Sequence, residues 1–411
     1  MSQRVIASGW GQVSPLAADF PTLTAAIAEG KMVAGQPWFD NERSWRDLRL
    51  NENPHFVPEA SSSLPPFQRV QPVIAEALAM ASLPSSALQG QRVRVYVAGN
   101  GVRPDIGDFA GYQDRNDAED LLFFPAIKRL HADSYGQDRF SHQLVEQFGL
   151  CWPPTSIYSA SNSALTALHL AQATIAAGQA DLVLLVGWME VMLQDVVFMG
   201  GQGMLGAGRA QPFSNHDTSV LLANGAVALV LESESHARQR GFTPSIAIDS
   251  SVCCQSSGGR GSSSFTADFR TIAQTLESAL LAAEVSPQDI ACTIPHANGI
   301  VAGDKAEAMA LQKVWGKRGV PVVSYKGQVG YLTTCSGALD FMLAADALQQ
   351  RRLLAVTTRS PIDEGLQVAV HADSAPLPLE KQHILKFGIG LDGSVIAMVV
   401  SACQEDTDES K

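Results

Sequence analysis

A serine-rich elbow is the part of this 411-residue chain with the clearest potential for covalent chemistry. Ser159-Ala160-Ser161-Asn162-Ser163 lies between an extended stretch, Pro153 to Tyr158, and a helical run that continues to Ala177. A strand-to-helix turn presents a side chain at a helix N-terminus, where free N–H groups and the helix dipole favour developing negative charge. Ser161 is therefore a candidate nucleophile, although serines at such a place more often cap the helix.

Continuous apolar runs indicate the strands that would support this elbow. Asp181 to Gly187, Ala226 to Glu232 and Ser394 to Val400 have strand length and almost no polar residues. Such runs are typical of strands covered on both faces. They predict buried sheets in both parts of the chain.

Helical periodicity predicts helices over 20–30, 73–80 and 161–177, and the last is apolar nearly all round, as in a buried or subunit-contact helix. Residues 36–66 are rich in Asn, Pro, Ser and Trp and predict a long loop or flap. Alternating helices and strands in both halves favour an α/β fold with sheets covered by helices.

Composition excludes several classes of protein. The chain is 46% hydrophobic and 17% charged, with a net charge of −12, which excludes a disordered chain and argues against nucleic acid as a partner. Its six cysteines show no metal-ligand spacing. The first residues lack a secretory signal and the apolar stretches are too short to cross a bilayer, so we expect a cytoplasmic protein without membrane insertion.

Further segments accompany the elbow in a fixed order. They are Ala160-Ser161-Asn162-Ser163 with Gly178 to Leu182, Gln211-Pro212-Phe213-Ser214 with Gly225-Ala226, His296-Ala297-Asn298-Gly299 with Gly303-Asp304 and Glu307-Ala308, Ser324-Tyr325-Lys326 with Gly330-Tyr331-Leu332 to Gly337, and Phe387-Gly388-Ile389-Gly390. This ordered set resembles the motifs of the β-ketoacyl-acyl-carrier-protein synthases, condensing enzymes of the thiolase superfamily. The resemblance covers nearly the whole chain.

The departures from the family fall on catalytic positions. Ser161 stands where chain-extending members have a cysteine, whose thiolate forms more readily than a serine alkoxide. Tyr331 stands at the second histidine, and a phenol donates a hydrogen bond without replacing an imidazole. Ile389 replaces a gating phenylalanine, and Asn224 replaces an acidic residue.

Other family positions are retained. By resemblance, His296 is the first histidine, and it is open to two interpretations, a working base or a core histidine. Lys326 is the family's lysine, and we expect Asp304 and Glu307 to pair with it as structural support. Phe387 is assigned, with Ile389, to the acyl tunnel or its gate.

Two more segments are weighed against that family. His131 and Tyr135 lie in the region from which, by resemblance, dimers pass residues into each other's tunnels, and they are candidate tunnel residues, with interface packing as the alternative. The glycine-rich run Met199 to Gly208 follows no dinucleotide-binding order and predicts a flexible segment near the pocket.

The resemblance implies a thiolase-like fold with two βαβ-rich halves in a five-layered αβαβα arrangement. We place the N-terminal half at residues 1–240, the C-terminal half at 241–403 and an acidic tail at 404–411. It also implies an obligate dimer, with which an all-round apolar helix agrees.

Reduction of the catalytic set from Cys-His-His to Ser-His-Tyr favours a non-elongating chain length factor of a type II polyketide, polyene or fatty-acid-like synthase. Such a subunit would form a heterodimer with a catalytic ketosynthase and shape its acyl tunnel. Acyl groups would arrive on the phosphopantetheine of an acyl carrier protein, with no other cofactor and no metal. The alternatives are a serine acyltransferase that uses Ser161 with His296 as base, and a homodimer that binds acyl chains without chemistry.

Overall fold

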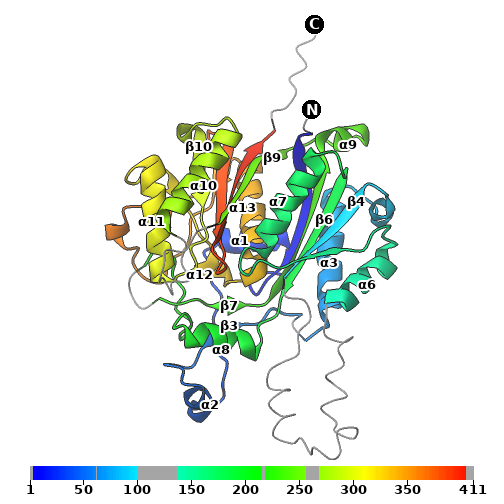
Figure 1. Cartoon of the computed structure of the whole chain (residues 1–411). Helices are drawn as coiled ribbons and strands as arrows, with labels where there is room; N and C mark the ends of the chain where they lie inside the picture. The colour runs from blue at the N-terminus through cyan, green and yellow to red at the C-terminus, as the bar shows by residue number, and fades with distance from the viewer. Residues whose placement is uncertain (1–2, 62, 100–136, 215–217, 256–267, 404–411) are drawn as a thin grey trace, which may run out of the picture.

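The computed structural model describes residues 3–61, 63–99, 137–214, 218–255 and 268–403 (Figure 1). The first half contains, in chain order, β1 (Val5–Val13), α1 (Phe20–Ala28), β2 (Gln36–Pro37), α2 (Glu42–Asp47), β3 (His55–Val57), α3 (Pro66–Met80), β4 (Val93–Ala98), α6 (Gln137–Phe148), β5 (Thr155–Ile157), α7 (Ser163–Ala176), β6 (Leu182–Met189), α8 (Leu193–Gly201), β7 (Leu222–Ala223), β8 (Gly225–Ser233) and α9 (Glu234–Gln239).

The second half contains β9 (Ile246–Gln255), α10 (Phe269–Ala282), β10 (Ile290–Ile294), α11 (Val301–Trp315), β11 (Pro321–Val322), α12 (Lys326–Val329), α13 (Ser336–Gln349), β12 (Arg352–Leu353), β13 (Ala369–Val370), β14 (Leu377–Pro378), β15 (His383–Ile389) and β16 (Ser394–Ala402). A short 3₁₀ turn, η4 (Thr333–Cys335), precedes α13.

One sheet carries both halves and repeats the same strand pattern. Its order is β13-β11-β10-β15-β16-β9-β1-β8-β6-β4-β5. Outward from the centre, each half has two antiparallel pairings followed by two parallel ones: β1-β8-β6-β4-β5 in the first half and β9-β16-β15-β10-β11 in the second. The halves are joined where β1 pairs with β9, so the fold is two copies of one βαβ-rich unit.

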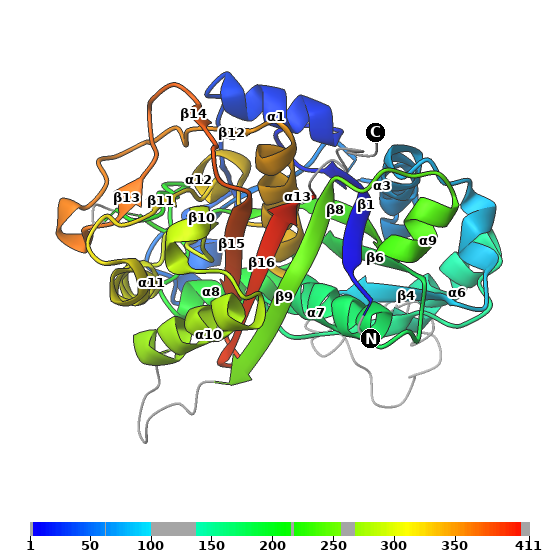
Figure 2. The same ribbon diagram turned by 90° about the horizontal axis from the view of Figure 1, so that it is seen from above.

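Alternation along the strands builds five layers. Leu185 of β6 and Val400 of β16 point into a central core, which also contains α7 and α13. Their neighbours Leu184 and Val399 point into separate outer cores, the first beneath α3 and α6 and the second beneath α10 and α11. The strands of each half form one layer, and each layer is covered on both faces. The layers therefore run helix, sheet, helix, sheet, helix (Figure 2).

The close contact of α3 with β1 explains two strand glycines. A Cβ on Gly9 would lie 2.1 Å from the carbonyl oxygen of Ala77, and one on Gly11 would lie 2.4 Å from that of Val73. Only a residue without a side chain allows the helix backbone to approach a strand this closely. Both glycines lie inside β1, where a side chain would collide with α3.

The predicted buried strands are confirmed as β6, β8 and β16, and the helix over 161–177 is confirmed as α7, beginning two residues later. The helix predicted at 73–80 begins earlier, at Pro66, and contains Pro72 in its interior. Residues 36–66 were expected to be a loop, but they form β2, α2, β3 and the start of α3. The pairing of β3 with the distant β7 stabilises these short elements and could not be read locally.

No helix in the described part of the chain is both long and apolar enough to cross a membrane. The predicted boundary at residue 240 and the acidic tail at 404–411 stay predictions, and the tail lies outside the described residues. The Gly/Ser-rich run that follows Gln255 in the sequence lies outside them as well.

Candidate active site

The serine elbow is strained and does not cap its helix. Ala160 has a φ of 43°, a left-handed conformation that costs an L-residue about 1–2 kcal/mol. Ser163 accepts a hydrogen bond from the Ser159 N–H at 3.0 Å and donates to the Ala160 carbonyl at 2.7 Å, while Asn162, which precedes α7, makes no side-chain cap. Ser161 lines the pocket instead, so the interpretation of this serine as a simple cap is not supported.

A second network anchors the elbow to the turn between β15 and β16. The Ser159 hydroxyl donates to Asp392 Oδ2 at 2.8 Å, and Asp392 Oδ1 accepts from the Ser394 hydroxyl at 2.6 Å. The Asn162 amide donates to the same Ser394 hydroxyl at 2.9 Å. The serine elbow and the β15–β16 turn, more than 200 residues apart in the chain, thus meet beside Ser161.

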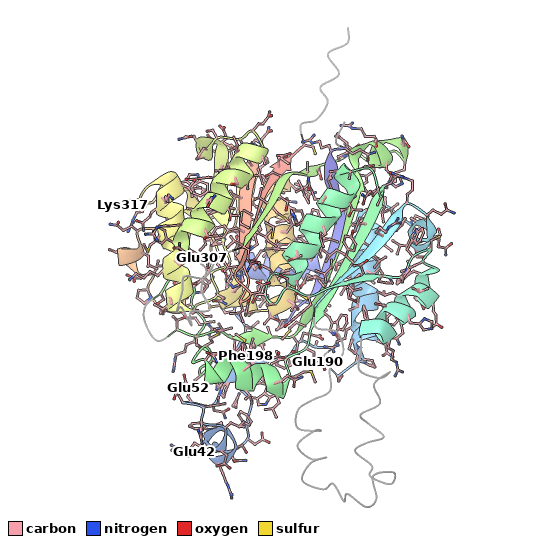
Figure 3. The ribbon with its side chains drawn as sticks, in the orientation of Figure 1. Glu42, Glu52, Glu190, Phe198, Glu307 and Lys317 are labelled. Atoms are coloured by element: carbon pink, nitrogen blue, oxygen red, sulfur yellow. The ribbon has the colours of Figure 1, made fainter. Side chains whose placement is uncertain are left out.

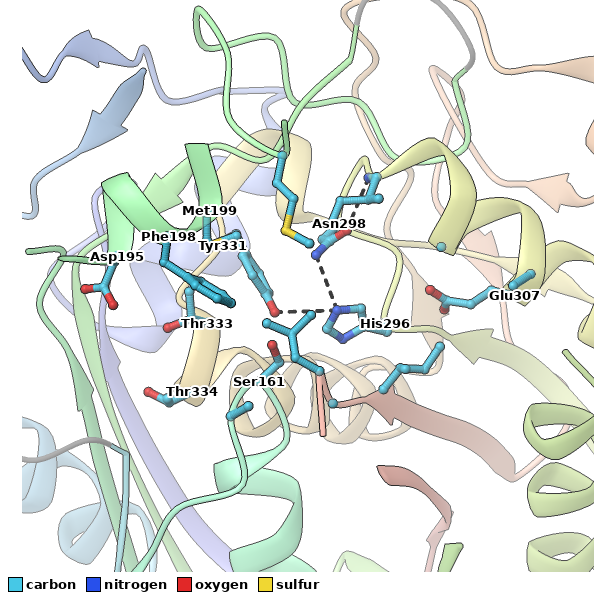
Figure 4. A pocket seen from close by; sticks show the side chains of 18 of the residues that line it. Ser161, Asp195, Phe198, Met199, His296, Asn298, Glu307, Tyr331, Thr333 and Thr334 are labelled. Carbon is cyan, nitrogen blue, oxygen red and sulfur yellow. Dashed lines mark hydrogen bonds between the residues drawn. The ribbon is translucent and has the colours of Figure 1, made fainter. Parts of the chain in front are cut away.

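The His296 ring faces two hydrogen-bond donors. Its Nε2 lies 3.3 Å from Asn298 Nδ2 and 3.4 Å from the Tyr331 hydroxyl, as the dashed lines in Figure 4 show. Asn298 Oδ1 accepts the Ile300 N–H at 3.2 Å, which leaves the amide nitrogen to face the imidazole. Because both neighbours donate, Nε2 acts as the acceptor and the ring proton resides on Nδ1.

Burial determines the protonation of this group. Burial lowers the pKa of His296 well below its usual value, and the charges of Lys326 and Lys386 lower it further. Burial raises the pKa of the Tyr331 phenol. Hydrogen bonds with the Ser161 hydroxyl and the Asn298 amide lower the pKa of this phenol in part. At neutral pH the site therefore holds a neutral imidazole and a neutral phenol.

The orientation of Ser161 matters for its chemistry. Figure 4 shows the Ser161 hydroxyl pointing toward Tyr331, with His296 to the side. Among the hydrogen bonds of the described residues, none joins Ser161 to His296, and Nε2 of His296 faces the Asn298 amide and the Tyr331 phenol. The serine therefore has no base within hydrogen-bond reach in this arrangement.

Lys326 has a different partner from those expected. Its Nζ donates to Asp340 Oδ2 at 2.7 Å, and Lys386 Nζ donates to the same oxygen at the same distance. All three side chains are at most 5% exposed. The expected pairing with Asp304 or Glu307 is wrong, because a carboxylate on α13 lies closer to the ammonium.

Asp304 and Glu307 bind backbone groups instead. Asp304 Oδ2 accepts the Phe213 N–H at 2.7 Å, and both Glu307 oxygens accept the Ala297 N–H at 3.0 and 3.1 Å. Burial raises the pKa of Asp304 to about 7. Burial, with the neighbouring charge of Asp304, raises the pKa of Glu307 to about 8. These carboxyls hold the Phe213 turn and the His296 segment in place.

One pocket unites these groups. It encloses about 900 Å³, open solvent at its mouth included. Its wall is largely apolar, with Phe198 of α8 half exposed at the rim (Figure 3). The lining residues are Tyr158, Ala160, Ser161, Asp195, Phe198, Met199, Met204, His296, Asn298, Ile300, Gly303, Ala306, Glu307, Tyr331, Thr333, Thr334, Ile389, Gly390 and Leu391.

The structure places the remaining sequence candidates in different surroundings. Ile389 lines the pocket, whereas Phe387 is fully buried in the outer core of the second half and is not among the lining residues. His131 and Tyr135 lie outside the described residues. The run Met199 to Gly208 does border the pocket, but its first residues belong to helix α8.

Sequence reasoning missed Asp340 and Lys386. A lysine inside the apolar run His383 to Ile389 was a visible signal, because an unpaired charge is rarely buried in a strand. Asp340 had no comparable signal within its helix. Among the described residues, no group of three or more His, Cys, Asp or Glu side chains is arranged to hold a metal ion.

Family models match most of the chain. The model described as "Beta-ketoacyl synthase, N-terminal domain" matches residues 9–237, and that described as "Beta-ketoacyl synthase, C-terminal domain" matches residues 249–358. Polyketide synthase GfsA of Streptomyces halstedii is 27% identical over 68% of the chain, and erythronolide synthase EryA2 of Saccharopolyspora erythraea is 26% identical over 85%. The chain spans only 4% and 10% of the lengths of these two proteins.

Solved structures agree on the fold. The ishigamide ketosynthase/chain length factor has a TM-score of 0.83 at 18% identity, covering 98% of this chain and 100% of that one. AntDE:AntF, a type II polyketide synthase acyl carrier protein in complex with its ketosynthase, has a TM-score of 0.81 at 19% identity, with the same coverage. These similarities confirm the predicted thiolase-like ketosynthase fold.

Proposed function

Because the chain belongs to the β-ketoacyl synthase family, we propose that it is a chain-length-factor-like subunit that performs no condensation of its own. In this role it pairs with a catalytic ketosynthase in the cytoplasm and shapes the tunnel that receives the growing acyl chain. The acyl groups arrive on the phosphopantetheine of an acyl carrier protein. We place this role in polyketide assembly because the matched relatives are named as polyketide and erythronolide synthases.

The observation that carries this proposal is the environment of His296. Its Nε2 faces Tyr331 and Asn298, and its pKa is lowered by burial and by two buried lysines. A weak base whose lone pair faces other donors does not activate a serine hydroxyl. The chain thus keeps the ketosynthase fold, while Ser161 has no base within hydrogen-bond reach.

Exposed groups near the rim of the pocket favour the binding of a partner chain. Strand β5 ends the sheet among the described strands, and its first two residues are exposed. Tyr158, which follows it, is 67% exposed although it lines the pocket, and Leu170 of α7 is 39% exposed nearby in the chain. A second ketosynthase subunit paired with this edge would cover these apolar groups and close the pocket.

A mass measurement tests the proposal directly. The protein is co-expressed with its candidate ketosynthase and carrier protein, and each chain is weighed intact for the wild type and for Ser161→Ala. We expect a stable heterodimer, no acyl adduct on this chain and unchanged product in the variant. Cys→Ala at the partner's nucleophile serves as the control that abolishes product.

A second function is favoured by one observation, the strained Ala160 that presents Ser161 to the pocket. If Ser161 becomes acylated and Ser161→Ala loses both adduct and product, the chain is a serine acyltransferase and the first proposal is wrong. The acyl group would then pass from Ser161 to water or to a carrier thiol, and no condensation would take place.

The partner surface has its own test. Leu170→Asp places a charge on the exposed part of α7 and is expected to dissociate the heterodimer in size-exclusion chromatography with light scattering. Leu281→Asp, on the 80% exposed site of α10, is the matched control and leaves it intact. Equal behaviour of the two variants would contradict the placement of the partner at β5.

A further inference from the structure

A second buried lysine, Lys386, lies behind the His296 loop, and its charge is one of the two that lower the pKa of His296. Lys386 lies in the middle of β15 and is 1% exposed. Its Nζ donates to Asp340 Oδ2 at 2.7 Å, to the Phe387 carbonyl at 2.8 Å and to the Pro295 carbonyl at 3.2 Å. Burying an ammonium group this completely costs free energy, and we therefore asked what its three hydrogen bonds do.

Lys386 is one of three side chains that hold the backbone on either side of His296. Pro295 directly precedes His296, so the bond to its carbonyl holds the histidine segment from one side. Glu307 holds the next residue, Ala297, through its N–H, and the Ser324 hydroxyl donates to the Ala297 carbonyl at 2.7 Å. The backbone on both sides of His296 is therefore fixed, and Lys386 supplies the contact from β15.

The charges around His296 do not balance. Lys326 and Lys386 share one carboxylate oxygen of Asp340, which leaves a surplus positive charge beside the imidazole. The other titratable groups that line the pocket with His296 are Tyr158, Asp195, Glu307 and Tyr331. Asp304 of α11 does not line it but acts on Glu307 through its charge. Burial raises the pKa of Asp304 and that of Glu307, so neither fully offsets the surplus at neutral pH.

We propose that Lys386 is a positioning residue that holds His296 as a neutral imidazole, with Nε2 fixed as a hydrogen-bond acceptor for Tyr331 and Asn298. The surplus ammonium adds to burial in opposing a charge on the ring, and the bond to the Pro295 carbonyl fixes the backbone that precedes His296. The lowered pKa of His296 agrees with this arrangement.

Nitrogen NMR of the purified, histidine-labelled protein tests this. The signals of His296, assigned with His296→Gln, should show a neutral ring protonated at Nδ1 at pH 6 in the wild type. In Lys386→Met the protonation constant of His296 should rise tenfold or more toward the ordinary pKa. Lys386→Arg retains the charge and should behave like the wild type.

Each other result overturns the proposal. An imidazolium at pH 6 in the wild type, an unchanged titration in Lys386→Met, or a Lys386→Arg that titrates like Lys386→Met would each exclude the assigned role. The signals of the remaining histidines report that the fold is intact. Should Lys386→Met not fold, Lys386→Gln removes the charge while keeping one donor, and carries the same comparison.

Discussion

Helices α7 and α13 occupy matching places in the two halves and begin in the same way. Each has 14 residues, and each follows a residue with positive φ three positions before its start, Ala160 with 43° and Thr333 with 39°. The residues after these, Ser161 and Thr334, both line the pocket. The duplicated fold thus directs two strained turns at one cavity.

The helices differ at their fifth residue. In α7 this is Ala167, packed in the central core, and in α13 it is Asp340, which binds two buried ammonium groups. The buried charges next to the pocket therefore belong to the second half, while the exposed sheet edge at β5 belongs to the first. One repeat of the fold supplies the electrostatic environment of the site, and the other supplies the sheet edge at which we propose that a partner binds.

The largest expected effect comes from Asp340→Ala, which makes α13 resemble α7 at this position. Two buried lysines then lose their carboxylate, and we expect a loss of about 3–5 kcal/mol in the free energy of unfolding, measured by urea denaturation. A triple variant with Asp340→Leu, Lys326→Met and Lys386→Met should recover most of this loss. A single variant within about 1 kcal/mol of the wild type would show that the charge pairing is unimportant for stability.

A smaller effect is expected where the two helices touch. A Cβ on Gly337 would lie 2.4 Å from Cγ of Leu165, so Gly337→Ala forces α13 away from α7. We expect a loss of about 1–3 kcal/mol in thermal or urea unfolding. Gly201→Ala, with nothing within 4 Å of the added carbon, is the control, and an equal effect of both would contradict the close packing.

The carboxyls on α11 predict a pH dependence. The folded-state pKa of Asp304 is about 7 and that of Glu307 about 8, both above their ordinary values, so the folded protein binds protons that the unfolded chain has released. Stability should therefore fall as the pH rises from 6.5 to 8. Glu307→Gln removes its share, about 2 kcal/mol over this interval. The slope is measured by urea unfolding at several pH values, with exposed Glu277→Gln as a control; an unchanged slope in Glu307→Gln would contradict the assignment.

The smallest effect concerns the two strained turns. Ala160→Gly removes the penalty of a positive φ and should raise the free energy of unfolding by up to about 1 kcal/mol. Thr333→Gly should gain less, because the Thr333 hydroxyl donates to Met189 Sδ at 2.8 Å. Calorimetry compares the two, and a larger gain for Thr333→Gly would break the equivalence of the turns.

The buried strands and the elbow could be predicted because their signals are local. Apolar runs such as Leu182–Met189 specify a strand covered on both faces, and the motif order brings Ser161, His296 and Tyr331 to one pocket. The lysine pairing could not be predicted. Lys326 and Asp340 are 14 residues apart across a turn, and Asp304 and Glu307 are acidic residues of the same motif region, so only the three-dimensional packing distinguishes them.

Side-chain direction was the other limit. Phe387 and Ile389 share a face of β15, so alternation alone assigns them the same surroundings. Both pack in the outer core of the second half, and only Ile389, the last residue of the strand, also reaches the pocket. Distance along the strand, rather than residue type, separates a pocket residue from a core residue here.

The short pairing of β1 with β9 has a thermal consequence. Only Val5, Ile6 and Ala7 pair with β9 across the junction of the halves, and a bulge follows between Ala7 and Gly9. Apart from these three pairs, side chains join the halves: the apolar side chains of the central core and the hydrogen bonds of Ser159 and Asn162 to the β15–β16 turn. Because hydrophobic contacts weaken on cooling while hydrogen bonds do not depend on this effect, the junction is the place where low temperature would first loosen the molecule.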